Sequence, residues 1–254
     1  APADSYRWWY VDALGDDGET GLTIIAFVGS VFSPYYAAAR RRGPADPLAH
    51  CALNVALYGR SARWAMTERG RNALQRSPQC LRIGPSALHW DGKALTIAID
   101  ERCFPRLSRL RGEVRVETDS LHDRRYALDA AARHHWWPIA PQARVTATFS
   151  NPALRWSGHG YFDSNYGAEP LEAGFRDWTW SRATVPQHTT VLYDALRRDG
   201  SELALALRFD AGTVQECAPP PTRDLPTSAW GLRRRTRVAA NEQARIARSM
   251  EDGP

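Results

Sequence analysis

Two Asp-Gly turns, each lying between segments of alternating hydrophobicity, constrain the fold of this 254-residue chain more than any other feature. The first turn is Asp91-Gly92-Lys93 and the second is Asp199-Gly200. Their flanking segments are His89–Trp90 and Leu95–Ile99 for the first, and Thr189–Leu196 and Leu203–Phe209 for the second. Asp-Gly favours the positive φ angles of tight hairpin turns, and period-two alternation is typical of half-buried strands. These signals predict antiparallel hairpins in both halves of the chain.

Similar strand-like segments recur along the rest of the chain, and helical patterns are rare. Ala239–Met250 is the one stretch in which we predict a regular helix. Pro138 and Pro141 indicate a break between two series of strands. We therefore predict an all-β fold of two antiparallel β-barrel or sandwich domains with few short helices, covering residues 1–140 and 141–254.

Composition and charge narrow the class of protein. Hydrophobic residues make up 43% and charged residues 24% of the chain, as in ordinary globular domains. The net charge is +5, but the basic residues are scattered and no nucleic-acid-binding motif is present, so we expect no nucleic-acid partner. The four cysteines are widely spaced, which favours free, buried thiols in a reducing compartment. No apolar run approaches the roughly 18 residues that a transmembrane helix needs.

Several kinds of catalytic site lack their sequence motif. There is no GxSxG turn for a serine nucleophile, and neither a Walker loop nor a GxGxxG turn for a nucleotide. The seven histidines do not have the spacing of a helical or finger-type metal site. We therefore predict no metal and no nucleotide or redox cofactor.

The stretch RWSGHGYFDSNYGAEPLE, residues 155–172, is the strongest candidate for chemistry. Its first half predicts a strand, which Asp163-Ser164-Asn165 would end. Asp163 then lies beside Tyr161 and Phe162, where poor hydration raises the pKa of a carboxyl group and keeps it protonated. A protonated carboxyl group can act as a general acid. The alternative is that Asp163 only forms an Asx turn after the strand.

Aromatic side chains are concentrated on both sides of this stretch. The run His134-His135-Trp136-Trp137 precedes it, and Trp178 and Trp180 follow it. Protonation of an alkene creates a carbocation, which the π-faces of aromatic rings stabilise. An acid among aromatic rings therefore suits acid chemistry on an apolar substrate. The alternative is that the tryptophans form the core of the second β domain.

Six segments carry a resemblance to a known family. They are YRWWYVDAL, IIAFVGSVFSPYYAAARRRG, HCALNVALYG, HHWWPIAPQARV, LRWSGHGYFDSNYGAEPLE and FRDWTWSRA. Through them the chain resembles the bacterial carotenoid 1,2-hydratases, also called hydroxyneurosporene synthases, from about Tyr6 to about Asp252. The resemblance implies two lipocalin-like β-barrel domains, in agreement with the predicted hairpins. Known members extend beyond both ends, so we expect this chain to be part of a longer protein with a truncated C-terminal domain.

The resemblance also implies an activity and a set of site residues. Members of the family add water, without a cofactor, across the terminal C1=C2 double bond of acyclic carotenoids such as neurosporene and lycopene. The resemblance implies Asp163 as the proton donor. It implies His134, Trp136 and Tyr161 as assisting residues. We expect four further tryptophans to bind the apolar substrate, namely Trp9, Trp156, Trp178 and Trp180.

A carotenoid substrate implies contact with a membrane, because such a hydrocarbon resides there. We expect the protein to bind peripherally to the cytoplasmic side of the bacterial photosynthetic membrane, through its arginine clusters and the segment Phe32–Tyr36. Two other functions remain open at this point. One is a polyene cyclase that uses the same acid, and the other is a non-catalytic lipid-binding protein with lipocalin-like barrels.

Overall fold

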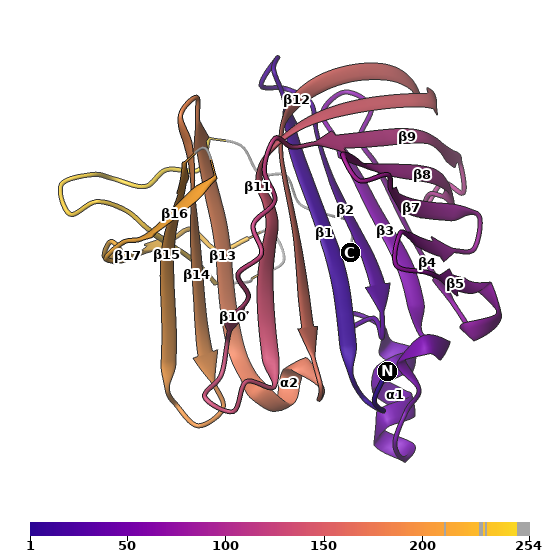
Figure 1. Ribbon diagram of the computed structural model, residues 1–254, viewed down its shortest axis with the longest axis horizontal. Helices are drawn as coiled ribbons and strands as arrows, with labels where there is room; N and C mark the ends of the chain where they lie inside the picture. The colour runs from indigo at the N-terminus through magenta and orange to yellow at the C-terminus, as the bar shows by residue number, and fades with distance from the viewer. Residues whose placement is uncertain (211, 229–230, 232, 248–254) are drawn as a thin grey trace. The chain divides into compact units, whose positions relative to one another are not determined.

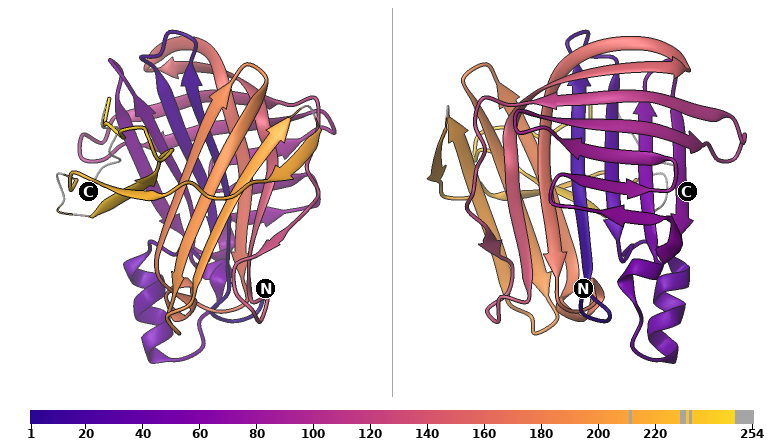
Figure 2. Two further views of the ribbon diagram at one scale, coloured as in Figure 1. Left: turned by 90° about the vertical axis from the view of Figure 1, so that its left-hand side faces the viewer. Right: turned by 45° about the vertical axis from the view of Figure 1, so that its right-hand side comes forward.

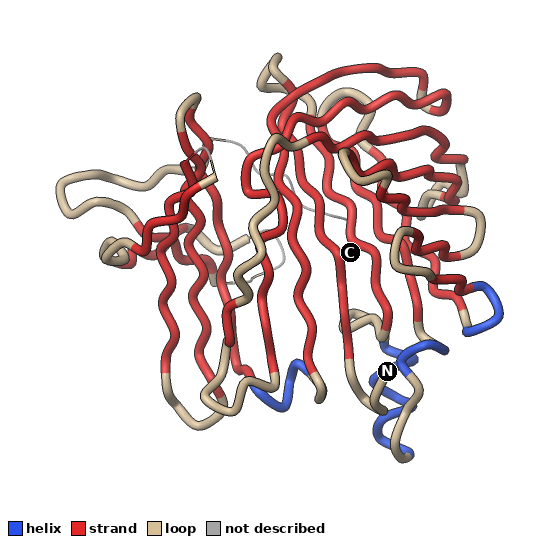
Figure 3. The backbone as a smooth tube through the Cα atoms, viewed as in Figure 1, coloured by secondary structure: helices blue, strands red, loops and turns tan. Residues whose placement is uncertain are grey.

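The structure, a computed structural model, describes residues 1–210, 212–228, 231 and 233–247 (Figure 1). The chain forms two compact units, unit 1 of Ala1–Leu171 and unit 2 of Glu172–Glu251. Strands dominate both units, and helices are short and few in the described part of the chain (Figure 3). The predicted all-β class is therefore confirmed.

Unit 1 is built around one antiparallel sheet of twelve strands. Along the sheet the order is β4-β3-β2-β1-β12-β11-β9-β8-β7-β6-β5, with β10 paired to β11. The strands are β1 Tyr6–Gly15, β2 Gly21–Val28, β3 Cys51–Tyr58, β4 Arg63–Arg69, β5 Leu74–Arg76, β6 Cys80–Ile83, β7 Ser86–Trp90, β8 Ala94–Arg102, β9 Arg109–Glu117, β10 Tyr126–Ala127, β11 His134–Asn151 and β12 Ala153–Gly167. The helical elements are α1 Pro34–Arg42 and the 3-10 turns Pro47–Ala49 and Arg71–Ala73, and α2 Leu171–Gly174 follows at the boundary with unit 2.

The sheet of unit 1 curls over on itself. The right-hand view of Figure 2 shows β6 to β9 crossing in front of β1 to β3. Side chains join β4 to β8, because Arg69 donates to the buried Glu101 at 2.6 Å, and Glu101 also accepts from Ser86 at 2.7 Å. A buried carboxylate with two such donors is compensated for its lost hydration. These contacts hold the curled sheet as an open barrel.

Apolar side chains from alternate strand positions fill the inside of this barrel. Val11 and Ala13 of β1, Ile24 of β2 and Val145 of β11 belong to one buried cluster. Close packing of the strands needs small residues at one point, since a Cβ atom on Gly158 would come within 1.9 Å of the Leu14 carbonyl oxygen. The absence of a side chain at Gly158 therefore lets the backbone of β1 come close to β12.

The two Asp-Gly hairpins predicted from the sequence are confirmed. In unit 1, β7 and β8 pair around Asp91-Gly92. In unit 2, β14 and β15 pair around Asp199-Gly200. Gly92 and Gly200 both have positive φ, at 96° and 88°, as tight hairpin turns require.

The described part of unit 2 forms two small antiparallel sheets. The order β13-β14-β15-β16 forms one sheet and β17-β18 the other. The bounds are β13 Phe175–Val185, β14 His188–Arg197, β15 Glu202–Asp210, β16 Thr213–Glu216, β17 Thr222–Leu225 and β18 Arg234–Arg237. Arg237 donates to both carboxylate oxygens of Asp194, at 2.9 and 2.6 Å, and so connects β18 to β14. Paired donors of this kind give a strong, directional contact.

Two expectations about chain organisation differ from the structure. The expected boundary between residues 140 and 141 falls inside β11, and the compact units divide after Leu171 instead. Pro138 and Pro141 are accommodated because the register of β11 against β12 shifts between Pro138 and Ala140 and between Ala140 and Ala143. Bulges of this kind tolerate a residue without a backbone donor.

The predicted helix over Ala239–Met250 is also wrong for its described part, since residues 239–247 contain no helix. Residues 248–250 lie outside the described residues. Its one large apolar side chain in this part, Ile246, is 37% exposed. An isolated segment without a buried face has little to stabilise a helix.

All four cysteines are free. Cys51 and Cys103 are buried as expected, but Cys80 is partly exposed and Cys217 is exposed. The expectation of buried thiols therefore holds for two of them.

Candidate active site

Asp163 lies within β12 rather than at its end. The strand continues to Gly167 because β1 and β11 pair with it on both sides over this stretch. The predicted strand end at Asp163-Ser164-Asn165 is therefore wrong, and no Asx turn forms there. In the register Asp163 lies opposite Tyr10 of β1 and Pro138 of β11. Pairing on both sides fixes the position of the carboxyl group.

One carboxylate oxygen of Asp163 accepts two hydrogen bonds. Trp136 Nε1 donates to Oδ2 at 2.8 Å, and the Tyr161 hydroxyl donates to the same oxygen at 2.9 Å. The Asp163 residue is 3% exposed, and Trp136 and Tyr161 are fully buried. The second oxygen, Oδ1, is buried and has no hydrogen-bond partner among the residues that the structure describes. Because two donors hold Oδ2 as an acceptor, the acid form carries its proton on Oδ1.

Burial raises the pKa of Asp163 from 3.8 to about 7. The hydrogen bonds from Trp136 and Tyr161 stabilise the carboxylate and limit this rise, while the charge of Asp12 adds to it. Desolvation outweighs the hydrogen bonds because the whole side chain lies away from water. Near neutral pH the group is therefore present both as an acid and as a base.

Aromatic rings surround this carboxyl group. Tyr161 meets Tyr10 edge-on with ring centroids 6.3 Å apart, and Trp136 packs against Tyr126 at 5.4 Å. Burial raises the pKa of Tyr161 well above 10, so its hydroxyl remains a donor at any pH at which the protein works. The structure thus brings three of the predicted catalytic residues, Asp163, Trp136 and Tyr161, into direct contact.

His134, the fourth predicted catalytic residue, is on the same face but has other partners. Its Nδ1 lies 2.9 Å from the Tyr6 hydroxyl and its Nε2 lies 3.1 Å from Glu169 Oε1. In the register His134 is opposite Gly167, four residues from Asp163 along β12, which corresponds to roughly 13 Å. Burial lowers the pKa of His134, so the ring is neutral at pH 7. Its assisting role stays a prediction.

The predicted substrate-binding tryptophans fall into two groups. Trp9 and Trp156 pack against the hydrophobic core of unit 1, on the face of the sheet that Asp163 does not share. Trp178 and Trp180 lie on β13 of unit 2. Trp156 therefore packs against the core of unit 1 and not in the core of a second β domain. The role of Trp9 and Trp156 in substrate binding stays a prediction. The role of Trp178 and Trp180 in binding stays a prediction.

Sequence reasoning missed three polar neighbours of the site, namely Tyr6, Asp12 and Glu169. Tyr6 and Asp12 share one face of β1 with Tyr10, since alternate residues of a strand point the same way. That alternation in YRWWYVD was the available signal. Glu169 follows β12 and has no signal of its own, because only the fold brings it to His134.

The described residues contain no group of three or more His, Cys, Asp or Glu side chains that could hold a metal ion. The chemistry available in the site is that of a carboxyl group, phenols and an indole. Fold and site together define a β-barrel protein with a buried Brønsted acid among aromatic rings.

The chain belongs to the carotenoid hydratase CrtC family, whose sequence profile matches residues 24–254. It is 58% identical over 252 residues to an acyclic carotenoid 1,2-hydratase of Thiocapsa roseopersicina, covering 98% of this chain and 62% of the relative. It is 47% identical over 260 residues to the enzyme of the same name from Rubrivivax gelatinosus, covering 100% of this chain and 64% of the relative. The chain therefore spans a little less than two thirds of each relative.

A solved structure supports the fold. A protein of Nitrosomonas europaea, assigned provisionally as an AttH, superposes with a TM-score of 0.62 at 15% sequence identity. The match covers 89% of this chain and 73% of that protein. At this identity the likeness concerns the lipocalin-like fold alone.

Proposed function

We propose that the protein adds water across the terminal C1=C2 double bond of an acyclic carotenoid such as neurosporene or lycopene. Its membership of the carotenoid hydratase family and its two hydratase relatives support this activity. The observation that carries the proposal is the Asp163 carboxyl group. It is buried, has a pKa of about 7, and has no partner for Oδ1 among the described residues. A group with these properties can protonate an alkene that water alone does not protonate.

The reaction begins with proton transfer from Asp163. The electron pair of the C1=C2 bond forms a new C–H bond at C2, while the O–H bond at Oδ1 breaks. A tertiary cation remains at C1, and Asp163 becomes a carboxylate. Trp136 and Tyr161 already donate to Oδ2, so they stabilise the negative charge that appears during this step.

Water then completes the addition. Its oxygen bonds to C1, and its surplus proton returns to the Asp163 carboxylate, giving a tertiary alcohol and the original acid. A pKa near 7 suits both steps, because the same group must give a proton and take one back. The faces of Trp136 and Tyr161 stabilise the cation between the two steps. No cofactor takes part in this scheme.

Capture of the cation distinguishes hydration from the competing cyclase reaction. The protein is incubated with lycopene in water enriched in heavy oxygen, and the products are analysed by mass spectrometry. We expect a tertiary alcohol that carries the heavy oxygen. An unlabelled cyclic isomer of lycopene would show that an internal double bond, not water, captures the cation. The reaction would then be a cyclisation and not a hydration.

The Tyr161→Phe variant tests the hydrogen bond from the Tyr161 hydroxyl to Asp163 Oδ2. Loss of this donor destabilises the carboxylate, so we expect kcat to fall roughly 10-fold. We also expect the pH above which kcat/KM declines to rise, because the pKa of Asp163 increases further. Tyr126→Phe is the control, since Tyr126 packs on Trp136 but does not bond to Asp163. An unchanged pH profile for Tyr161→Phe would contradict the assigned contact.

We further propose peripheral binding to the cytoplasmic side of the photosynthetic membrane. Phe32 and Tyr35, just before and within α1, are 58% and 71% exposed. The last turn of α1 carries Arg40, Arg41 and Arg42. Exposed aromatic rings beside a cationic cluster suit an anionic membrane surface. No helix in the described part of the chain is long and apolar enough to cross a membrane.

A further inference from the structure

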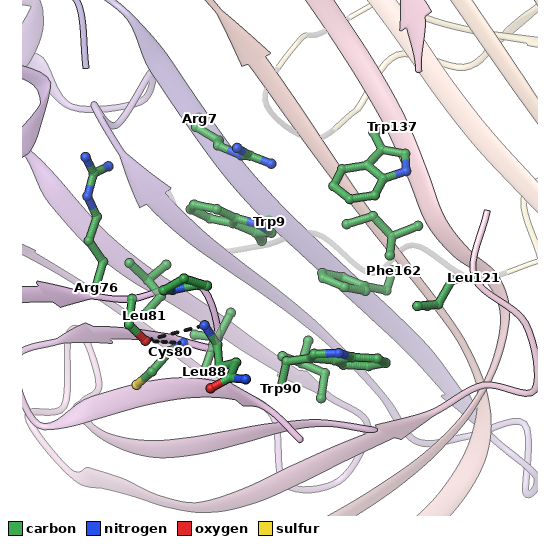
Figure 4. A pocket seen from close by; sticks show the side chains of 15 residues that line it. Arg7, Trp9, Arg76, Cys80, Leu81, Leu88, Trp90, Leu121, Trp137 and Phe162 are labelled. Atoms are coloured by element: carbon green, nitrogen blue, oxygen red, sulfur yellow. Dashed lines mark hydrogen bonds between the residues drawn. The ribbon is translucent and has the colours of Figure 1, made fainter. Parts of the chain in front are cut away.

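A second candidate site lies inside the barrel of unit 1. Its cavity has a volume of about 460 Å³, within the range of small-molecule sites. Apolar side chains form most of its wall, and Figure 4 shows them projecting from strands on opposite sides. The main ones are Trp9, Leu88, Trp90, Trp137 and Phe162.

This cavity is separate from the Asp163 carboxyl group. Phe162 lines the cavity, and Asp163, the next residue on the same strand, points to the opposite face. The same alternation separates Trp137, which lines the cavity, from Trp136, which bonds to Asp163. The middle of the sheet therefore stands between the two sites.

Cationic side chains gather at one end of the cavity. Arg7 and Arg76 line it, from β1 and β5, and Figure 4 shows both on the same side of it. Arg125 lies over the ring of Trp137, with its guanidinium carbon 4.9 Å from the ring centroid. None of the three forms an ion pair within the part of the chain that the structure describes. Three arginines that are not paired with acidic side chains attract an anion.

Arg7 is the best placed of the three to bind such an anion. Its guanidinium lies over Trp9 at 4.8 Å and over Tyr166 at 5.1 Å, and its Nε donates to Ser164 Oγ at 3.2 Å. These contacts orient the group and leave its two terminal nitrogens as donors. Burial lowers the pKa of Arg7, Tyr166 raises it, and the charges of Arg125 and Arg76 lower it further. A bound anion would relieve this repulsion.

We propose that the barrel of unit 1 binds an amphipathic carboxylate of the long-chain fatty-acid type. The hydrocarbon chain would lie among the tryptophan and leucine side chains, and the carboxylate would accept from Arg7. An uncharged hydrocarbon would fill the cavity equally well but would leave the cations unpaired. The charge of the ligand is therefore the property that tests the proposal. The site does not depend on the hydration activity.

The test uses cis-parinarate, a fluorescent long-chain carboxylate, and its uncharged methyl ester. Fluorescence titration of the whole protein should show one site, with the ester bound at least about 10-fold more weakly than the acid. Arg7→Gln should weaken acid binding by about 10-fold and leave ester binding unchanged. Arg82→Gln is the control, because Arg82 is an exposed arginine on β6 that does not line the cavity.

A further variant locates the ligand. Leu88→Trp narrows the cavity, so in a variant that folds, as shown by circular dichroism, both ligands should bind more weakly. Absence of binding, equal affinity for acid and ester, or unchanged acid binding by Arg7→Gln would each overturn the proposal. Unchanged binding by folded Leu88→Trp would do so as well. If Leu88→Trp does not fold, the comparison of acid and ester with Arg7→Gln still decides.

Discussion

The Asp163→Asn variant should lose the proposed hydratase activity by about 10³-fold while it keeps the fold. A general acid contributes roughly 10² to 10⁴ to the rate, and an amide cannot take its place at neutral pH. Asparagine has the shape of aspartate, and its carbonyl oxygen can still accept from Trp136 and Tyr161. Turnover of lycopene or neurosporene and a circular dichroism spectrum of the variant measure the two expectations.

A matched carboxylate makes this result specific. Asp100 of β8 is held by Arg109 at 2.6 Å, and this ion pair keeps the pKa of Asp100 below its ordinary value. We expect Asp100→Asn to retain wild-type turnover. If Asp163→Asn is as active as Asp100→Asn, the acid is elsewhere. If the protein binds a carotenoid but neither the wild type nor any variant turns it over, the protein is a non-catalytic lipid-binding protein.

The same residue should control how the stability of the protein depends on pH. The folded state holds the proton on Asp163 more tightly than the unfolded chain, because its pKa rises from 3.8 to about 7 on folding. This contribution to stability is fully present below the unfolded pKa and is lost as the pH rises through the folded pKa. The full loss is about 4 kcal/mol. Asp163→Asn removes the titrating group and with it this loss.

Urea denaturation at pH 5 and pH 8 measures the effect. From pH 5 to pH 8, the free energy of unfolding of Asp163→Asn should rise by about 2.5 kcal/mol relative to that of the wild type. For Asp100→Asn the difference from the wild type should not change over the same range, since Asp100 is ionised throughout. A pH-independent difference for Asp163→Asn would mean that the carboxyl group has an ordinary pKa in the folded protein.

Local sequence signals were sufficient for the hairpins. The Asp91-Gly92 and Asp199-Gly200 turns are formed by neighbouring residues, so tertiary contacts did not alter them. The prediction that the strand ends at Asp163 is wrong for the opposite reason. Asp-Ser-Asn favours a turn in isolation, but pairing of β12 with β1 and β11 outweighs that local preference.

The predicted domain boundary between residues 140 and 141 is wrong for a similar reason. Pro138 and Pro141 read as breaks because each removes a backbone donor, yet shifts of register in β11 absorb both. The long strand that results is what brings Trp136 next to Asp163.

The centre of the site was predictable, whereas its surroundings were not. The family resemblance and the apolar neighbours of Asp163 indicated an acid with a raised pKa, in agreement with the structure. The contact between His134 and Tyr6 joins residues 128 positions apart, so no local pattern could reveal it. Whether a tryptophan packs inside the barrel depends on which positions of its strand face the interior. The sequence alone did not determine these positions.

Direct titration of Asp163 tests the central claim most directly. In protein labelled with ¹³C at the aspartate side-chain carboxyl carbon, the resonance absent from Asp163→Asn identifies this residue in the wild type. We expect its chemical shift to titrate with a midpoint near pH 7. A midpoint near pH 4 would show an ordinary ionised carboxylate, which could not supply the proton for hydration.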